Sequence, residues 1–318
     1  MNIKKSIFIV LTCFSLLFQS CKSTIDVTNY SASRVTQTNY PINAGVNLSL
    51  SIIETGFAKT SEAFVFKGGG LFKKRRLSHV SVLIQHPNAT FVFDTGLGSG
   101  IEGQFHDAFG FIDRQLFQFT KLTSLKETLI ENDFNIDSID FILPTHLHFD
   151  HASGIEDFSN VTVLTTKEEY EHAMSDEANP PAFIKEQYDS DLIKWKFIQF
   201  NTTPYEVFEE SYDVFNDGTV ILVKLPGHTR GSLGMFVNLM SGKRYFFTGD
   251  LTWAAEAFEA PSEKFFIARN KVDGDRESVK KYIVKVHQLL KEKPEIKIIP
   301  AHDFNAQKEI AKFPNVEH

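Results

Sequence analysis

The stretch from Thr145 to His151 brings together groups that bind divalent metal ions. It places three imidazoles and one carboxylate within six residues, namely His146, His148, Asp150 and His151. Neutral imidazoles and a carboxylate are the ligand set that suits zinc and similar divalent ions. Because the chain has only 11 His among 318 residues, a chance cluster of this kind is improbable. The motif therefore predicts a metal site.

Three further potential ligands follow this cluster, and each stands just after a short β-rich run. His228 lies in a Pro-Gly-His-Thr sequence, Asp250 in Thr-Gly-Asp, and His302 in Pro-Ala-His-Asp. This recurrence predicts a site assembled from the ends of strands. Within the first motif, His146 and His148 are two residues apart in an extended segment, so they project to the same side. The Asp and His that follow stand where the chain turns towards a helix, and they can face a second ion.

The apolar residues also predict the elements that must hold these loops. Alternating apolar positions indicate strands, and a spacing of three to four residues indicates helices. The predicted strands are 46–53, 79–84, 90–93, 139–143, 161–164, 234–239, 244–247 and 296–299, with a further β-rich run over 196–225. The predicted helices are 122–132, 167–174 and 277–290. The strands 79–84 and 90–93 should form a hairpin around His86-Pro87-Asn88.

Taken together, these motifs resemble the metallo-β-lactamase-fold hydrolases, whose pattern is HxHxDH followed by a lone His, an Asp and a final His. The resemblance covers roughly residues 46–313. It implies an α/β fold, an αββα sandwich of two mixed β-sheets flanked by helices. It also implies two zinc ions per chain, with other divalent metals as alternatives.

The resemblance further implies a role for each ligand position. The ligands implied for the two ions are His146, His148 and His228 for one, Asp150, His151 and His302 for the other, and Asp250 as the bridge between them. Asp94 lies in the Asp-Thr-Gly turn that follows the hairpin. It would orient ligating imidazoles rather than bind metal itself, as carboxylates around metal sites commonly do.

Such a site implies a hydrolase in which two zinc ions activate a hydroxide that attacks a small ester or lactone. Asp150 would orient the nucleophile and pass a proton to the leaving group. The motifs are similar to those of the acyl-homoserine lactonase branch, which typically has a Tyr three residues after the bridging Asp. Trp253 stands there instead, and its indole can donate a hydrogen bond but cannot act as a proton acid. Two alternatives stay open: an organophosphate or aryl-ester hydrolase of the same fold, and a non-catalytic metal-stabilised binding protein.

Composition narrows the class of partner. The net charge of −7 argues against a nucleic-acid partner, which usually requires a basic balance, so we expect a small-molecule substrate. The basic run from Lys73 to Arg76 is either a solvated loop tip or a positive rim at the mouth of the site. The Phe-rich stretch 105–119 is either a core stripe or an apolar wall facing substrate. Glu256 either lines the pocket, caps a helix or pairs with Lys264. The sequence does not indicate an oligomeric state.

The amino terminus has the pattern of an export signal. Lys4 and Lys5 precede an apolar run from Ile7 to Phe18, which is too short to span a bilayer comfortably. The Ser-Cys pair at Cys21 resembles the cleavage site of bacterial lipoproteins. We therefore expect a signal peptide over 1–21, a flexible tether over 22–45 and a hydrolase domain over 46–318. The protein would be exported and anchored to a bacterial membrane through the lipidated Cys21, or else be periplasmic or secreted.

Overall fold

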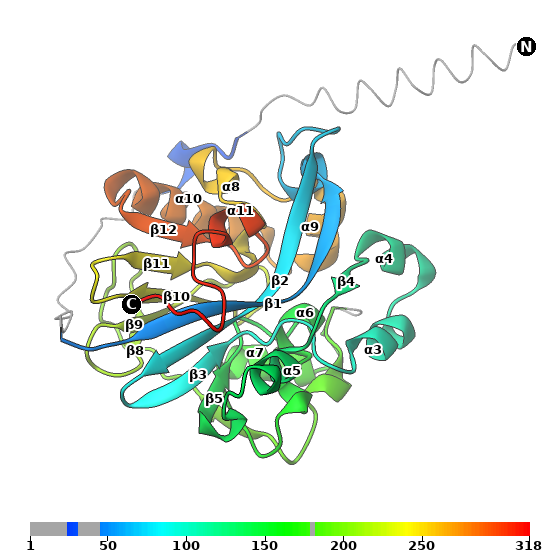
Figure 1. Ribbon diagram of the computed structural model, residues 1–318. Coiled ribbons are helices and arrows are strands. Elements are labelled where there is room, and N and C mark those ends of the chain that lie inside the picture. The colour runs from blue at the N-terminus through cyan, green and yellow to red at the C-terminus, as the bar shows by residue number, and fades with distance from the viewer. Residues whose placement is uncertain (1–23, 31–44, 179–181) are drawn as a thin grey trace, which may run out of the picture.

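The computed structural model describes residues 24–30, 45–178 and 182–318. In these residues two mixed β-sheets face each other, and helices lie on the outer side of each sheet (Figure 1). This arrangement confirms the fold class expected from the sequence, an α/β chain folded as an αββα sandwich.

The first sheet has seven strands in the order β4-β1-β2-β3-β5-β6-β7. Its strands are β1 (Ser49–Ser61), β2 (Lys74–His86), β3 (Ala89–Phe93), β4 (Thr120–Lys121), β5 (Ile139–Leu143), β6 (Thr162–Thr165) and β7 (Lys194–Phe197). The pairs from β4 to β3 are antiparallel, whereas β3, β5, β6 and β7 run parallel. The predicted hairpin is present as β2 and β3.

The second sheet has five strands in the order β12-β11-β10-β9-β8. Its strands are β8 (Ser211–Asp213), β9 (Val220–Lys224), β10 (Leu233–Asn238), β11 (Arg244–Phe247) and β12 (Ile296–Ile299). Since β9 and β11 are both antiparallel to β10, and β12 is parallel to β11, the strands β9, β11 and β12 all run in one direction. Their carboxyl ends therefore meet at one edge of the sheet.

Alternation along the strands supplies three hydrophobic layers. In β2, Val82 and Ile84 pack between the two sheets, whereas Leu83 packs on the outer side. In β9, Leu222 packs between the sheets and Ile221 packs on the outer side of the second sheet. Because successive side chains of a strand point to opposite faces, both faces of these strands are buried, and their sequences read as continuous apolar runs.

The longer helices cover the outer faces. The helices are α2 (Glu62–Val65), α3 (Ile101–Ala108), α4 (Phe111–Leu116), α5 (Leu125–Glu131), α6 (Phe149–Ala152), α7 (Lys167–Met174), α8 (Glu256–Glu259), α9 (Phe266–Val272), α10 (Arg276–Glu292) and α11 (Phe304–Gln307). Short 3-10 turns complete the set: η1 (Val27–Asn29), η2 (Ile136–Ser138), η3 (Ile155–Asp157), η4 (Lys185–Gln187) and η5 (Gly249–Leu251). Helix α10 buries Val279, Ile283 and Val286 against the second sheet. Asp275 caps its amino end, because the carboxylate accepts from the backbone N–H groups of Glu277 and Ser278 in the first turn.

The predicted elements are confirmed with shifts at their ends. The predicted helices correspond to α5, α7 and α10, and the predicted strand over 139–143 is β5. The β-rich run over 196–225 contains the end of β7 and the strands β8 and β9, which are separated by irregular chain. Helix α3 overlaps the start of the Phe-rich stretch and α4 lies within it, although the sequence predicted no element there.

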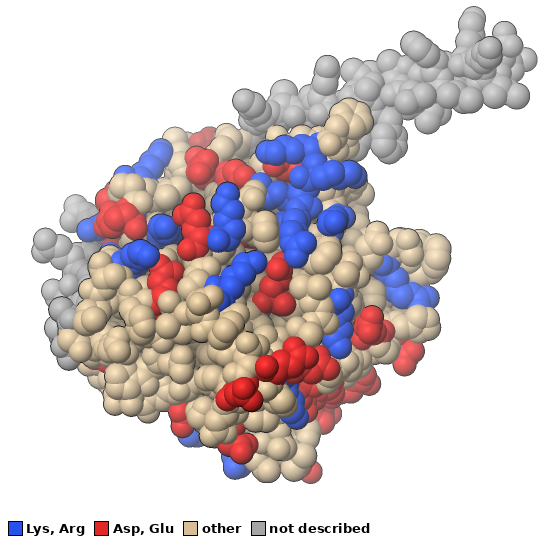
Figure 2. All heavy atoms as spheres, viewed as in Figure 1, with Lys and Arg blue, Asp and Glu red and all other residues tan. Residues whose placement is uncertain are grey.

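The expected signal peptide, 1–21, lies outside the described residues, as does most of the expected tether. Of the tether, residues 24–30 contact the domain: the N–H of Ile25 donates to the carbonyl of Pro261 at 2.6 Å, and the hydroxyl of Tyr30 donates to Glu277 at 3.2 Å. Within the described residues, no helix has the length and apolar character needed to cross a membrane. On the face shown in Figure 2, Lys and Arg gather over the free end of the β1–β2 hairpin.

Candidate metal centre

The sequence-predicted ligands stand on loops from both sheets. Strand β5 of the first sheet leads into the His-rich motif, which continues into α6. In the second sheet, His228 follows β9, Asp250 lies in η5 after β11, and His302 follows β12. Since these three strands run in one direction, their loops leave the sheet at the same edge. The structure brings all seven side chains together there.

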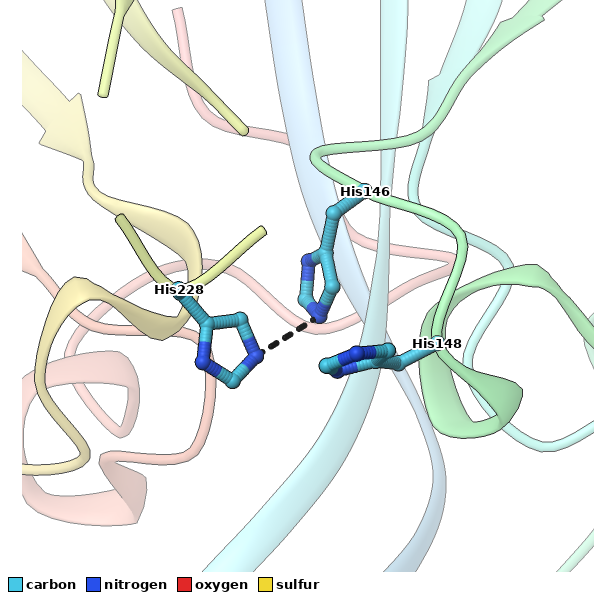
Figure 3. A group of neighbouring side chains, drawn as sticks. All are labelled: His146, His148 and His228. Atoms are coloured by element: carbon cyan, nitrogen blue, oxygen red, sulfur yellow. Dashed lines mark hydrogen bonds between the residues drawn. The ribbon is translucent and has the colours of Figure 1, made fainter. Parts of the chain in front are cut away.

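Three imidazoles form the first group, His146, His148 and His228 (Figure 3). All three are buried, and Nε2 of His146 lies 3.1 Å from Nε2 of His228. Burial lowers the pKa of each of these imidazoles, so they are neutral at neutral pH and have lone pairs to offer. Zinc–nitrogen bonds of about 2.0–2.1 Å at tetrahedral angles place neighbouring ligand atoms about 3.3 Å apart. The spacing of these nitrogens fits a bound ion.

The remaining four side chains form a second group beside the first. Nε2 of His302 lies 3.0 Å from Oδ1 of Asp250 and 3.4 Å from Oδ2 of Asp150, and Nε2 of His151 lies 3.4 Å from Oδ1 of Asp250. Oδ2 of Asp250 also lies 3.6 Å from Nε2 of His228 in the first group. Asp250 therefore stands between the two groups, where a bridging ligand would be.

Two buried atoms of this second group support its use as a cation site. Nε2 of His151 and Oδ1 of Asp250 have no hydrogen-bond partner in the described part of the chain. Leaving such groups buried and unpaired costs about 1–3 kcal/mol each, a cost that a bound cation would remove. Burial opposes ionisation of both carboxyls, but the neighbouring imidazoles hold the pKa of Asp150 and of Asp250 below the usual range. The donor set thus fits divalent metal ions.

The Nδ1 atoms of four ligand imidazoles are held by hydrogen bonds. His151 donates to Asp94 at 2.9 Å, His228 to Asp273 at 2.8 Å, His302 to the carbonyl of Ser78 at 2.8 Å, and His146 to the hydroxyl of Thr145 at 2.8 Å. A proton fixed on Nδ1 leaves the Nε2 lone pair free for a metal and fixes the orientation of the ring. The sequence prediction included only Asp94 among these partners. Asp273, Ser78 and Thr145 were missed because no local pattern marks them.

Asp94 has a backbone conformation that suits its position below the ligands. It has φ 56°, in the left-handed region that Asp tolerates better than most residues. Its Oδ1 accepts from the N–H of Thr145 at 2.6 Å, while its Oδ2 accepts from His151. One carboxylate thereby fixes both the start of the His-rich loop and one of its imidazoles.

Trp253 contacts the candidate bridging ligand. Its indole N–H donates to Oδ2 of Asp250 at 2.8 Å. Trp253, which stands where lactonases have a Tyr, thus uses its N–H to hydrogen-bond the carboxylate of a candidate metal ligand. The Trp253 ring also lines the cavity described next.

A cavity of about 300 Å³ opens onto both groups of ligands. Its walls include Leu77, Phe109, Phe117 and Phe149, and polar atoms contribute a minority of its surface. Phe109 is buried and packs against Phe105 in the core, with the two rings tilted by 31°. Both interpretations of the Phe-rich stretch are therefore correct in part, because one stretch supplies core residues and cavity wall.

Two sequence interpretations are corrected by the buried charges around the site. Arg75 is 4% exposed and binds Glu256 through two hydrogen bonds of 2.6 and 2.9 Å, and Asp303 at 2.9 Å. It is therefore not part of a solvated loop tip, since β2 carries it inward. Glu256 pairs with Arg75 rather than with Lys264, whose ammonium donates to Asp273 at 2.7 Å.

Comparison with known proteins places the fold and motifs in one family. The family model described as the metallo-beta-lactamase superfamily matches residues 75–302. The N-acyl homoserine lactonase AttM of Rhizobium radiobacter is 29% identical over 182 residues, which are 57% of this chain and 64% of AttM. The N-acyl homoserine lactonase AiiA of Bacillus thuringiensis subsp. kurstaki is 25% identical over 238 residues, 73% of this chain and 84% of AiiA. This chain thus spans less than two thirds of the length of AttM.

Solved structures show the same fold. A structure of an N-acyl homoserine lactone hydrolase with the product N-hexanoyl-L-homoserine bound at its catalytic metal centre superposes with a TM-score of 0.66. It is 21% identical, and the match covers 86% of this chain and 99% of that one. AidC, a dizinc quorum-quenching lactonase, superposes with a TM-score of 0.53 at 15% identity over 89% of this chain and 92% of AidC.

Proposed function

Because this chain belongs to the metallo-beta-lactamase superfamily, we propose that it is a metal-dependent hydrolase that uses two zinc ions to cleave a small ester or lactone. One observation carries the proposal: seven buried or nearly buried ligand side chains form two adjoining groups at the end of an apolar cavity. A protein that needed metal only for stability would not require a ligand-sized cavity open to both groups.

We infer an N-acyl homoserine lactone, or a lactone of similar chemistry, as the first substrate class to test. The relatives AttM and AiiA are N-acyl homoserine lactonases, which supports this choice. The cavity suits such a molecule, because its Phe and Leu walls match an acyl chain while the ligand end matches a polar ring carbonyl. Lys59 and Lys271 line the same cavity.

The side chains of the site would divide the work as follows. Metal ions held there would supply Lewis acidity towards the substrate oxygen and would lower the pKa of water. Asp150, kept as a carboxylate by the neighbouring imidazoles, would orient the attacking water, accept its proton and deliver that proton to the leaving oxygen. Phe149 and Phe117 would exclude bulk water from the acyl side of the cavity.

A second candidate function is the hydrolysis of aryl esters or aryl phosphotriesters. The contact between Trp253 and Asp250 favours it, because the site then lacks the phenolic acid that lactonases place here. An aryl leaving group departs as a stabilised phenolate, so it depends less on protonation than the alkoxide of an opened lactone does. The apolar, aromatic cavity accommodates either substrate.

Localisation is proposed from the sequence alone. We propose that the protein is exported and anchored to a bacterial membrane through the lipidated Cys21. Labelling of the growing host with a radioactive fatty acid tests this: the label should enter the protein and should be lost in Cys21→Ala.

The test of function is an activity panel with zinc-loaded protein. The panel contains N-acyl homoserine lactones of several chain lengths, simple lactones, aryl esters and aryl phosphotriesters. Asp150→Asn should abolish turnover, whereas Asp107→Asn, the same change on an exposed side chain that does not line the cavity, should leave it unchanged. Lactone turnover lost in Asp150→Asn supports the first proposal, and turnover confined to aryl substrates supports the second. Two bound metals with no turnover of any substrate would favour the metal-stabilised binding protein.

A further inference from the structure

An eighth polar side chain, His79, lies among the candidate ligands and has no role in the pattern described so far. It stands in β2, next to Ser78, whose carbonyl accepts from His302. The residue is 7% exposed and lines the cavity. Its ring lies 5.0 Å from the ring of His302 and 6.2 Å from that of Phe119, measured between centroids. The sequence prediction placed it in a strand and gave it no chemistry.

The two ring nitrogens of His79 are buried, and neither makes a hydrogen bond to any described residue. Nδ1 lies 3.2 Å from Oδ2 of Asp150, but that contact is not aligned for a hydrogen bond. This distance is the one expected between two atoms that bind the same metal ion. Metal–ligand bonds of about 2.1 Å at angles of 90–110° place neighbouring ligand atoms about 3.0–3.4 Å apart. An imidazole buried without a partner costs about 1–3 kcal/mol per unpaired group.

The neighbours of His79 are those of the second metal group. His79, Asp150 and His302 each offer one ligand atom, and the three atoms all lie within 4.8 Å of one another. The same Asp150 and His302 stand beside Asp250 and His151. A cation placed among these groups would therefore be within reach of His79 as well.

We propose that His79 is an additional ligand of the second ion, which would then be held by three imidazoles and two carboxylates. This inference rests on the proposed two-metal function. It makes the two sites unequal: the first has three imidazoles and the shared Asp250, whereas the second has five protein ligands and a position for water or substrate. Six-fold coordination by nitrogen and oxygen is not the four-fold geometry that zinc usually adopts. The second site should therefore accept Fe²⁺, Co²⁺ or Mn²⁺ more readily than the first does.

The test is a cobalt titration of metal-free protein, followed by calorimetry and by visible absorption. Wild type should bind two Co²⁺ in two steps, and one of the two should absorb weakly, as six-coordinate Co²⁺ does. In His79→Gln and in His79→Leu, one step should weaken by at least about tenfold, and the absorption of that ion should intensify as it loses a ligand. Gln offers an N–H donor near Asp150 without an imidazole, so it separates a ligand from a mere hydrogen-bond donor.

The matched control is His86→Gln. His86 is also 7% exposed and also lies in β2, but it pairs with Asp217 away from the cavity, so both binding steps should match those of wild type. Thermal unfolding of the metal-free variants shows whether each one folds. If His79→Gln bound both Co²⁺ ions as tightly as wild type, the inference would be overturned, whether or not His79→Leu bound them more weakly. If wild type itself failed to bind two ions, the proposed function would fall, and that result is distinct from a failure confined to the variants.

Discussion

The buried pair of Lys264 and Asp273 makes the most quantitative prediction of the structure. Their side chains are 0% and 1% exposed, and Lys264 Nζ lies 2.7 Å from Oδ1 of Asp273. The same oxygen accepts from Nδ1 of His228 at 2.8 Å. Asp273→Asn keeps the shape of the side chain but leaves the ammonium of Lys264 buried without its counter-charge.

Removing one partner of a buried ion pair costs about 3–5 kcal/mol. We therefore expect Asp273→Asn to lower the free energy of unfolding of the metal-free protein by that amount. Lys264→Met/Asp273→Asn should recover most of the loss, because the two charges disappear together. In both variants an uncharged amide oxygen replaces the carboxylate that accepts from His228, so binding of the first ion should weaken by about 10–100-fold in both.

The effect of pH on this pair has a definite sign. Burial alone would raise the pKa of Asp273, but Lys264 and His228 hold it below its usual range. A depressed carboxyl pKa contributes stability that is present above the unfolded value of about 3.9 and is lost as pH falls through the folded value. The difference between wild type and Asp273→Asn should thus be constant near neutrality and shrink below about pH 4.

The assay is urea unfolding of metal-free wild type, Asp273→Asn, Lys264→Met and the double variant, at neutral and at acidic pH. Metal affinity is measured separately by competition with a chelator. A loss below about 1 kcal/mol in Asp273→Asn, or a double variant no more stable than the singles, would show that the pair does not stabilise the fold as argued.

Three further predictions concern the same region. Trp253→Phe removes the hydrogen bond to Asp250, so a chelator should extract metal about tenfold more readily; unchanged extraction would mean that this contact does not support the ligand. Gly98→Ala would drive a Cβ into the carbonyl of Ser153, so it should lower the free energy of unfolding in urea by about 1–3 kcal/mol. Gly103→Ala in α3 has open space around it and should raise that free energy by about 0.5–1 kcal/mol. Equal effects of the two substitutions would refute the packing argument. Removal of metal from loaded protein should lower the melting temperature by several degrees, since ligand at about 100 times its Kd stabilises by about 2.7 kcal/mol; an unchanged temperature would argue against binding to the folded state.

The sequence predicted the parts of this protein that depend on local pattern. The strand 139–143 and the helix 167–174 carry clear apolar periodicity, and both are present within these bounds. The seven predicted ligands meet because each follows a strand whose direction the fold sets. Side chains that depend on distant partners were missed or misjudged. Arg75 lies in a basic run that looks solvated, yet β2 turns it towards Glu256 and Asp303.

His79 and Asp273 show the same limit. A His in an apolar strand and an Asp between a helix and a Gly carry no signal of their own. Only the approach of Asp150 to the first, and of His228 and Lys264 to the second, gives them a possible role. The contacts His79–Asp150 and His228–Asp273 join residues far apart in the chain, so no short window of sequence contains them. Lys264 lies only nine residues before Asp273, but the sequence does not show that both side chains are buried and paired.

The division of the ligands between the two sheets has a consequence for kinetics. The loop after β5 belongs to one sheet, whereas the loops after β9, β11 and β12 belong to the other. Ions held between these loops would link the two sheets at the edge where the loops meet. Separation of the two sheets at this edge would therefore have to break bonds between metal and ligand. Bound metal would then slow any separation of the two sheets at that edge, although the cavity gives the ions a separate path to solvent.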